Sequence, residues 1–255
     1  MIQAIFFDID GTLITFGAEK MSDVTIDTLR RLKEQGIRIF IATGRATVEM
    51  DLITKDMDFD GYVTLNGQLC MDHDWKCYYG NPMHPDDRKQ IQEAFEKKEI
   101  PIYLVTENRS FINILTDPVV NIHKMFNIKK PAVEEYHGEP IYQLNLYEDE
   151  AAVEEFMKKI PHSQARRWHS KGYDVFSKTG SKMVGIEKTL EHYGIRREEI
   201  MAFGDGSNDI EMLQFAGIGV AMGNAVPEAK AAADYVTCNV EDEGIFHAVQ
   251  HFGLL

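Results

Sequence analysis

Short apolar runs alternate with amphipathic segments over the first 65 residues of the chain. The run Ala4 to Phe7 is continuously apolar, which is typical of a strand buried on both faces of a parallel sheet. Apolar residues at helical spacing between Ser22 and Gly36 carry start and stop signals for a helix. The predicted elements are a strand over 4–7, a helix over 22–36, a strand over 37–42, a helix over 47–56 and a strand over 61–65.

The same alternation returns near the other end of the chain. The predicted elements there are a helix over 182–193, a strand over 200–203, a helix over 207–215 and a strand over 218–221. An alternation of strands and helices favours a parallel sheet with right-handed crossovers. We therefore expect the two ends of the chain to form halves of one sheet.

The middle of the chain has a different pattern. A hairpin is predicted over 68–79, and Pro82 and Pro85 then mark a boundary. The elements predicted beyond it are helices over 86–99 and 150–159 and strands over 102–105, 111–115, 141–147, 166–168 and 173–176. The expected fold class is α/β, with a Rossmann-like parallel-sheet core over 1–81 and 181–255 and an inserted α+β domain over 82–180.

Composition and charge argue against several classes of protein, among them membrane-spanning and nucleic-acid-binding proteins. No apolar run approaches the ~18 residues of a membrane span, and the net charge of −14 disfavours nucleic acid and anionic lipid as partners. The three cysteines, Cys70, Cys77 and Cys238, have no spacing typical of a disulfide framework or a zinc site. The nine histidines are scattered, so we expect surface or packing roles for them. The residues after Met1 have no signal peptide pattern, so we expect a cytoplasmic protein. We also expect a monomer.

Two acids follow the first predicted strand directly. Asp8 and Asp10 are separated by one residue, so on an extended strand end both point to the same side. Gly11 allows a sharp turn there, with backbone N–H groups facing an anion. Ligands of open α/β sheets bind at the carboxyl ends of strands. This segment is therefore a candidate catalytic site.

Three further polar groups stand at strand ends or helix starts. Thr43 and Gly44 follow the second strand, Lys182 opens a helix, and an acidic loop over 204–209 follows the strand 200–203. A lysine at a helix start is an arrangement that binds phosphate. Carboxylates of Asp8, Asp10 and Asp205 are hard oxygen ligands of the kind that Mg²⁺ prefers.

These groups occur in an order that resembles the haloacid dehalogenase (HAD) superfamily, in particular its Cof-type branch. The segments that carry the resemblance are 6–13 (FFDIDGTL), 41–45 (IATGR), 66–67 (NG), 204–213 (GDGSNDIEML) and 219–225 (GVAMGNA). The resemblance spans nearly the whole chain. It implies a HAD core with an inserted cap of the C2 type (C2B) that determines substrate specificity.

The resemblance also implies a role for each site residue. Asp8 would be the nucleophile, and Asp10 the general acid and later the general base, with an aspartyl-phosphate between the two steps. Mg²⁺ would bind Asp8, the backbone carbonyl of Asp10, and Asp205, with Asp209 in support. The residues expected to hold the phosphoryl group are Thr43, Lys182 and Asn208, with the N–H groups of Ile9 and Gly44. Family members often have Lys-Gly where this chain has Lys182-Met183, so Lys178 is an alternative for the third motif.

The expected substrate is a small phosphorylated metabolite, most plausibly a hexose or pentose phosphate, bound between core and cap. Pyridoxal phosphate and flavin mononucleotide are alternatives. Candidate substrate contacts are Arg45, Asn66, Trp168, Tyr173 and Asp174. A dehalogenase, a phosphonatase and a phosphomutase share the nucleophile, and a non-catalytic phosphate sensor shares the fold. Asp10 favours a phosphatase over a dehalogenase or phosphonatase, because an ester leaving group needs a proton. A phosphomutase would keep both acids and would be distinguished by transfer to a second sugar hydroxyl, and the intact acids at 8, 10 and 205 argue against a sensor.

Overall fold

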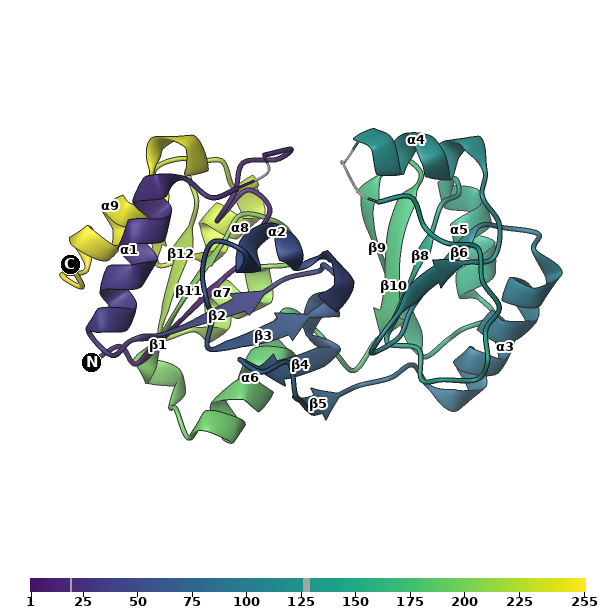
Figure 1. Cartoon of the computed structure of the whole chain (residues 1–255), viewed down its shortest axis with the longest axis horizontal. Coiled ribbons are helices and arrows are strands. Elements are labelled where there is room, and N and C mark those ends of the chain that lie inside the picture. Colours follow the sequence, from purple (N-terminus) through teal and green to yellow (C-terminus); the bar gives the residue numbers. More distant parts are fainter. Residues whose placement is uncertain (19, 126–128) are drawn as a thin grey trace. The chain divides into compact units, whose positions relative to one another are not determined.

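The computed structural model describes residues 1–18, 20–125 and 129–255 (Figure 1). The chain divides into two compact units. Unit 1 comprises residues 1–45, 50–79 and 181–255, and unit 2 comprises residues 46–49 and 80–180. Among the described residues, no helix combines the length and the apolar character that crossing a membrane requires.

Unit 1 contains an eight-stranded sheet in the order β13-β12-β11-β1-β2-β3-β4-β5. Its strands are β1 (Ala4–Phe7), β2 (Arg38–Ala42), β3 (Gly61–Thr64), β4 (Leu69–Asp72), β5 (Cys77–Gly80), β11 (Ile200–Gly204), β12 (Ile218–Ala221) and β13 (Tyr235–Val236). The six strands from β13 to β3 pair in parallel, and β4 pairs antiparallel with β3. The two ends of the chain therefore form one mainly parallel sheet, as the sequence predicts.

Helices cover both faces of this sheet (Figure 1). One face packs on α1 (Asp23–Glu34), α2 (Asp51–Thr54) and α9 (Gly244–His251). The other packs on α6 (Lys182–Tyr193), α7 (Ile210–Phe215) and α8 (Pro227–Ala232). Successive residues of β1 point to opposite faces, so Ile5 and Phe7 join the first core while Ala4 and Phe6 join the second. Burial on both faces explains the continuous apolar run.

The strand order reverses at β1. From β1 the chain builds outward through β2 and β3 on one side and through β11, β12 and β13 on the other. Crevices at such a reversal, beyond the carboxyl ends of the strands, are where open α/β sheets bind ligands. Asp8 is the first residue after β1, and its N–H donates to the Phe203 carbonyl at 3.0 Å. The topology thus places the first acid of the sequence at the reversal.

Unit 2 is a five-stranded sheet with helices packed against both faces. Its strand order is β7-β6-β8-β10-β9, and its pairings are antiparallel. The elements are α3 (Pro85–Lys97), β6 (Ile102–Val105), β7 (Ser110–Ile112), α4 (Asp117–Met125), β8 (Gln143–Leu146), α5 (Glu150–Met157), β9 (Ser163–His169) and β10 (Gly172–Ser177). Side chains of α3 and α5 form one core with β6, β8 and β10.

The structure differs from the predicted elements in two respects. The helix predicted over 47–56 is a 3-10 turn (Thr47–Glu49) followed by the single turn of α2, which contains the β-branched Ile53 and Thr54. The helices α4, α8 and α9 and the short strand β13 were not predicted. Pro227 in the first turn of α8 is a start signal in the sequence, but the helix has six residues and a short apolar pattern.

Candidate active site

The segment after β1 forms a compact loop that presents two acids. The Ile9 carbonyl accepts hydrogen bonds from the N–H groups of Thr12, Leu13 and Ile14, which closes the loop tightly. Gly11 has φ of +86°, and a Cβ there would lie 2.2 Å from Oδ2 of Asp205. Only glycine fits this position, because any side chain would collide with the carboxylate. The Ile9 side chain is buried in the core, and its carbonyl is used within the loop. Of the polar groups of Ile9, the backbone N–H is therefore the one that could bind a ligand.

Lys182 lies fully buried between two carboxylates. Its Nζ donates to Oδ1 of Asp8 at 2.5 Å and to Oδ1 of Asp209 at 2.6 Å. The side chains of Lys182 and Asp209 are both 0% exposed. The lysine comes from the start of α6, whose N-cap Ser181 accepts from the Val184 N–H. The structure therefore brings Lys182 into contact with the expected nucleophile.

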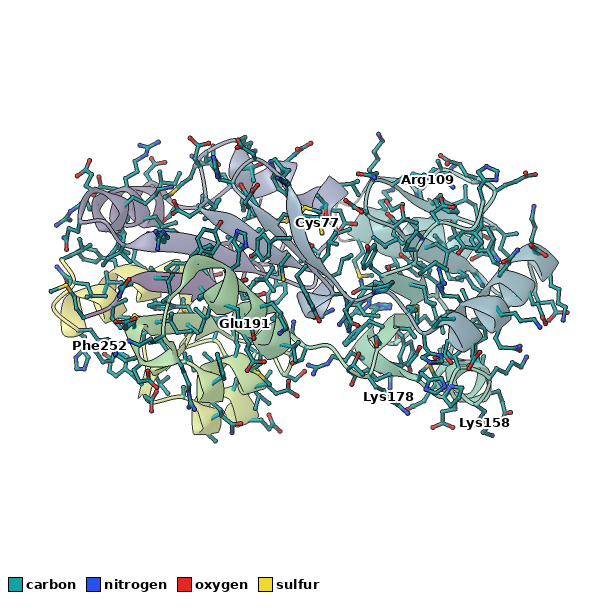
Figure 2. The ribbon with its side chains drawn as sticks, turned by 90° about the horizontal axis from the view of Figure 1, so that it is seen from below. Cys77, Arg109, Lys158, Lys178, Glu191 and Phe252 are labelled. Carbon is teal, nitrogen blue, oxygen red and sulfur yellow. The ribbon has the colours of Figure 1, made fainter. Side chains whose placement is uncertain are left out.

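Lys178, the alternative for the third motif, has different surroundings. It is exposed in unit 2, where it is labelled in Figure 2. Its Nζ donates to the Pro161 carbonyl at 2.7 Å, and its N–H donates to the His162 carbonyl. Of the two lysines, the structure therefore places Lys182 in the acidic cluster.

Asp209 anchors the acidic loop after β11. Its Oδ2 accepts from the N–H of Asp205 at 2.9 Å and of Gly206 at 2.8 Å, while Oδ1 accepts from Lys182. Both oxygens are therefore engaged within the protein. Asp205 accepts a hydrogen bond from Thr12 Oγ1 at 3.3 Å, and its carboxylate lies beside the first loop. Asp209 thus acts as the support of Lys182 and of the loop that carries Asp205.

Burial governs the protonation of this cluster. It raises the pKa of Asp8 well above the usual 3.8; the nearby carboxylates, Asp209 first, add to the rise, and Lys182 opposes it. Burial also raises the pKa of Asp205 to about 7, with Asp209 contributing. Burial alone would lower the pKa of Lys182, but Asp209 and Asp8 outweigh it, so this pKa lies above 10.5. The cluster holds more negative charge than its lysine compensates.

This excess charge fits a divalent cation. Carboxylate oxygens of Asp8, Asp205 and Asp209 lie within 4.8 Å of one another. Three carboxylates share one ammonium group, so two negative charges stay uncompensated when all are ionised. Because the oxygens of Asp209 are engaged elsewhere, Asp8 and Asp205 are the side chains suited to hold the ion. An all-oxygen donor set with this charge matches Mg²⁺.

Asp10 is held by Arg45 in a bidentate ion pair. Nε of Arg45 donates to Oδ2 at 2.7 Å, and Nη2 donates to Oδ1 at 2.6 Å. Both side chains are partly exposed, unlike the buried pair of Asp8 and Lys182. The sequence singled out Arg45 as a substrate contact, whereas the geometry gives it a partner within the protein. Such a fork-shaped contact fixes the orientation of the carboxylate.

Thr43, Asn66 and Asn208 are joined at the same edge of the sheet. The Asn66 N–H donates to the Thr43 carbonyl at 2.9 Å, and the Asn208 amide donates to Oδ1 of Asn66 at 3.3 Å. Thr43 is buried and its Oγ1 accepts from the Arg45 N–H, so its own hydroxyl proton stays available for an anion. Gly44 lies against the Asn66 side chain. The expected phosphate-binding residues of the second and fourth segments thus lie together.

A second glycine sets where α6 begins. Gly67 has φ of +86°, and a Cβ there would lie 1.9 Å from the Ser181 carbonyl oxygen. The absence of a side chain lets the start of α6 approach the 66–67 turn. Because Lys182 is the first residue of α6, this close contact determines the position of its ammonium group.

The candidate substrate contacts in unit 2 do not all lie on the same face of its sheet. Tyr173 is buried in the core beneath α3 and α5, whereas Asp174, the next residue of β10, points to the opposite face. There Asp174 accepts a hydrogen bond from the Asn145 amide at 2.5 Å and is paired in register with Arg166. Trp168 is 37% exposed. Tyr173 therefore cannot serve the same ligand as Asp174.

Two residues of the site received no role from the sequence. Asn224 donates to the Gly11 carbonyl at 2.8 Å and accepts from the Val240 N–H at 2.8 Å. Thr12 donates to Asp205. Asn224 follows β12 closely, so the rule that polar residues at strand ends meet at one edge could have found it.

Comparisons with known proteins agree with this architecture. The family model described as haloacid dehalogenase-like hydrolase matches residues 5–249. BT1666 from Bacteroides thetaiotaomicron, described as a phosphatase of the haloalkanoate (HAD) enzyme superfamily, is 34% identical, with a TM-score of 0.89 over 100% of this chain and 96% of that one. BT4131, described as a sugar phosphatase of HAD subclass IIB, is 33% identical, with a TM-score of 0.86 over 99% of this chain and 100% of that one.

A curated relative from another organism matches over a similar length. It is the 5-amino-6-(5-phospho-D-ribitylamino)uracil phosphatase YitU of Bacillus subtilis (strain 168), which is 28% identical over 97% of this chain and 96% of that protein. The family model and these relatives cover nearly the whole chain, including the acids after β1 and β11 and the lysine of α6. The chain belongs to the haloacid dehalogenase-like hydrolase family.

Proposed function

We propose that this chain is a Mg²⁺-dependent phosphatase that hydrolyses small phosphorylated metabolites through an aspartyl-phosphate. The observation that carries the proposal is the position of Asp8. Its carboxylate lies at the reversal of the strand order, held on one oxygen by the buried Lys182. In the described part of the chain, no donor reaches its second oxygen, which suits that oxygen to attack phosphorus. Asp10, two residues later, belongs to the same loop.

The reaction divides into two steps. Asp8 attacks phosphorus, the bond from phosphorus to the leaving oxygen breaks, and Asp10 in its acid form gives a proton to the departing alcohol. Asp10, now a carboxylate, takes a proton from the water that attacks the aspartyl-phosphate, which releases inorganic phosphate and restores both acids. Through its two hydrogen bonds Arg45 orients the carboxylate form of Asp10, which acts as the base in the second step.

Positive charge and donors act on the transferred group. We expect Lys182, Thr43 and Asn208 to donate to phosphoryl oxygens, together with the N–H groups of Ile9 and Gly44. Bound Mg²⁺ supplies the charge that offsets the two uncompensated carboxylates and lets a phosphate dianion approach. The residues that would hold it are Asp8, Asp205 and the backbone carbonyl of Asp10.

For the substrate we favour a hexose or pentose phosphate, with unit 2 as a C2-type cap that selects it. The similarity to BT4131, which is described as a sugar phosphatase, supports this choice. So does the polar pair of Asn145 and Asp174, on the face of the unit 2 sheet opposite α3 and α5, because amide and carboxylate groups hydrogen-bond to hydroxyls. The similarity to YitU makes a ribitylaminouracil phosphate the second candidate.

A panel of phosphate esters with Mg²⁺, read as released phosphate, tests the proposal. The panel contains glucose 6-phosphate, ribose 5-phosphate, 5-amino-6-(5-phospho-D-ribitylamino)uracil, pyridoxal phosphate and flavin mononucleotide. We expect the highest kcat/KM for a sugar phosphate, and we expect the Asp8→Asn variant to release no phosphate from any ester in the panel. A preference of more than about tenfold for one of the other three would overturn the sugar assignment. Phosphate binding without any turnover would favour a sensor instead.

A further inference from the structure

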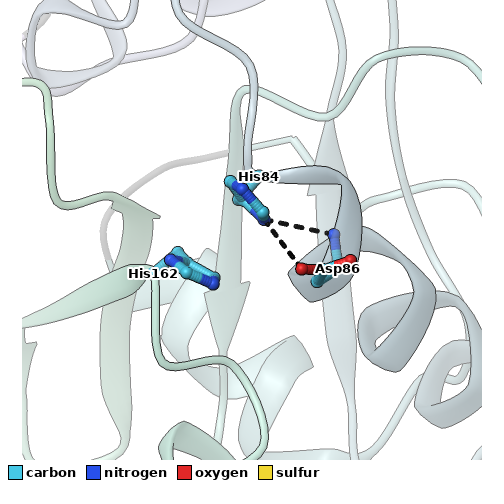
Figure 3. A group of neighbouring side chains, drawn as sticks. All are labelled: His84, Asp86 and His162. Carbon is cyan, nitrogen blue, oxygen red and sulfur yellow. Dashed lines mark hydrogen bonds and ion pairs between the residues drawn. The ribbon is translucent and has the colours of Figure 1, made fainter.

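Unit 2 carries a second cluster of metal-binding side chains, outside the acidic site. His84 precedes α3, Asp86 lies in the first turn of that helix, and His162 lies in the turn before β9 (Figure 3). One potential ligand atom from each of the three lies within 4.8 Å of the others. All three side chains are exposed, so an ion can reach them from solvent.

The geometry of the cluster is compact. Nδ1 of His84 accepts from the Asp86 N–H at 3.3 Å and lies 3.6 Å from Oδ2 of Asp86, so the ring is held beside this carboxylate. The rings of His84 and His162 stack with centroids 3.9 Å apart and planes inclined by 27°. Because both rings are exposed, rotation about χ2 turns a nitrogen of each toward a common ion beside Asp86.

A buried carboxylate holds the two halves of the cluster in place. Asp87, next to Asp86 on α3, is 0% exposed and accepts from the His162 N–H at 3.1 Å and from Ser163 Oγ at 2.6 Å. The His162 carbonyl accepts from the Lys178 N–H at 3.0 Å. The main chain of His162 is thus tied on both sides. This framework fixes its distance from α3 before any ion binds.

We propose that His84, Asp86 and His162 bind a borderline transition-metal ion, with Zn²⁺ as the expected ion. Two imidazole nitrogens and one carboxylate oxygen form a donor set that suits Zn²⁺, Co²⁺ and Ni²⁺, and a water completes the coordination at this exposed position. Mg²⁺ is excluded from this site, because it prefers oxygen ligands. The positive end of the α3 dipole also disfavours an ion held by charge alone, so coordinate bonds must supply the affinity.

His162 is separated from His84 and Asp86 by most of unit 2 in the sequence, which explains why the three form no recognisable motif. An ion there would join the start of α3 to the turn before β9. It would therefore stabilise unit 2 against unfolding. This proposal does not depend on the phosphatase assignment, since none of its residues belongs to the acidic cluster of unit 1.

The test is a titration of the full chain with Co²⁺, followed by the visible absorption of the bound ion and by its displacement with Zn²⁺. Mg²⁺ is kept in large excess to occupy the acidic cluster of unit 1. We expect one tight Co²⁺ site in the wild type and in Asp205→Asn. Affinity should fall by about tenfold or more in His84→Gln and in His162→Gln. The matched control is His137→Gln, another exposed histidine of unit 2.

Two further measurements separate loss of a ligand from loss of structure. Without metal, His162→Gln should melt at the wild-type temperature, whereas His84→Gln also loses the N-cap bond to the Asp86 N–H and is compared with its own metal-free state. All ligand variants should hydrolyse phosphate esters at the wild-type rate in Mg²⁺. Zn²⁺ should raise the melting temperature of the wild type and of His137→Gln but not of the ligand variants. Asp86→Asn, at an exposed carboxylate, serves as the third variant. Equal Co²⁺ affinity in the wild type and in all three ligand variants would overturn the proposal.

Discussion

Replacing Lys182 by methionine removes the ammonium group that the structure places inside the acidic cluster. Methionine has a similar length and no charge, so the volume of the buried side chain is nearly kept. The change deletes two charge-assisted hydrogen bonds, to Asp8 at 2.5 Å and to Asp209 at 2.6 Å. Three carboxylates, including Asp205, then remain together without a cation from the protein.

The expected loss of unfolding free energy is large and depends on pH. Removing one partner of a buried ion pair costs about 3–5 kcal/mol, because the other charge stays buried. Asp8, whose pKa is already raised, responds by holding its proton to still higher pH. A carboxyl whose pKa is higher in the folded than in the unfolded chain loses about 1.4 kcal/mol of stability per pH unit between the two values. The loss should therefore increase as the pH rises above the raised pKa of Asp8 in the wild type, and should be smaller in more acidic solution.

Urea unfolding in EDTA measures this difference. Trp75 belongs to unit 1 and stacks on Tyr62, so in a Trp168→Phe background its fluorescence reports unit 1. The matched control is Lys188→Met on the same helix, where the lysine pairs with an exposed Glu191 and the expected change is within about 0.5 kcal/mol. Phosphate release by Lys182→Met should fall by about 10² or more. A loss of stability equal to that of the control, or one that does not change with pH, would refute the reasoning.

Four further predictions concern the reaction and its cation. Asp8→Asn should stay folded and release no phosphate above background; retention of even about a tenth of the wild-type rate would contradict the nucleophile assignment. Asp10→Asn should lose more activity on alkyl phosphates than on p-nitrophenyl phosphate, since only the former need a proton, so equal losses would argue against its acid role. EDTA should abolish activity. The Mg²⁺ concentration needed for the half-maximal rate should be higher at pH 6 than at pH 8. The reason is that Asp205, with a pKa of about 7 without the ion, becomes protonated as the pH falls. The same Mg²⁺ requirement at both pH values would exclude Asp205 as a ligand.

The sequence predicted the parallel sheet and the strand ends that carry the acids. Buried parallel strands need continuous apolar runs, so β1, β2 and β11 can be predicted from the sequence alone. Because the carboxyl ends of neighbouring parallel strands meet at one edge, Asp8, Thr43 and Asp205 were expected to converge, and the structure has them at that edge. Local pattern was insufficient for α4, α8 and α9, which are short and depend on tertiary packing.

The sequence predicted only some of the residues that make up the site. It singled out Lys182 without deciding against Lys178, because both are lysines close to the start of one helix. In the structure Lys182 contacts Asp8 and Asp209, whereas Lys178 is exposed and donates to the Pro161 carbonyl. The pairing of Arg45 with Asp10, and the opposite directions of Tyr173 and Asp174, likewise depend on distances across the folded chain.

What the sequence determined by itself is therefore the chemistry available at each strand end, since strand burial and turn signals are local properties. What only the tertiary structure decided is which of these groups touch. The cluster of His84, Asp86 and His162 shows the difference most clearly, because two scattered histidines become neighbours through the buried Asp87 that ties α3 to the turn before β9. Contacts between residues far apart in sequence arise from packing, which no short segment of the chain encodes alone.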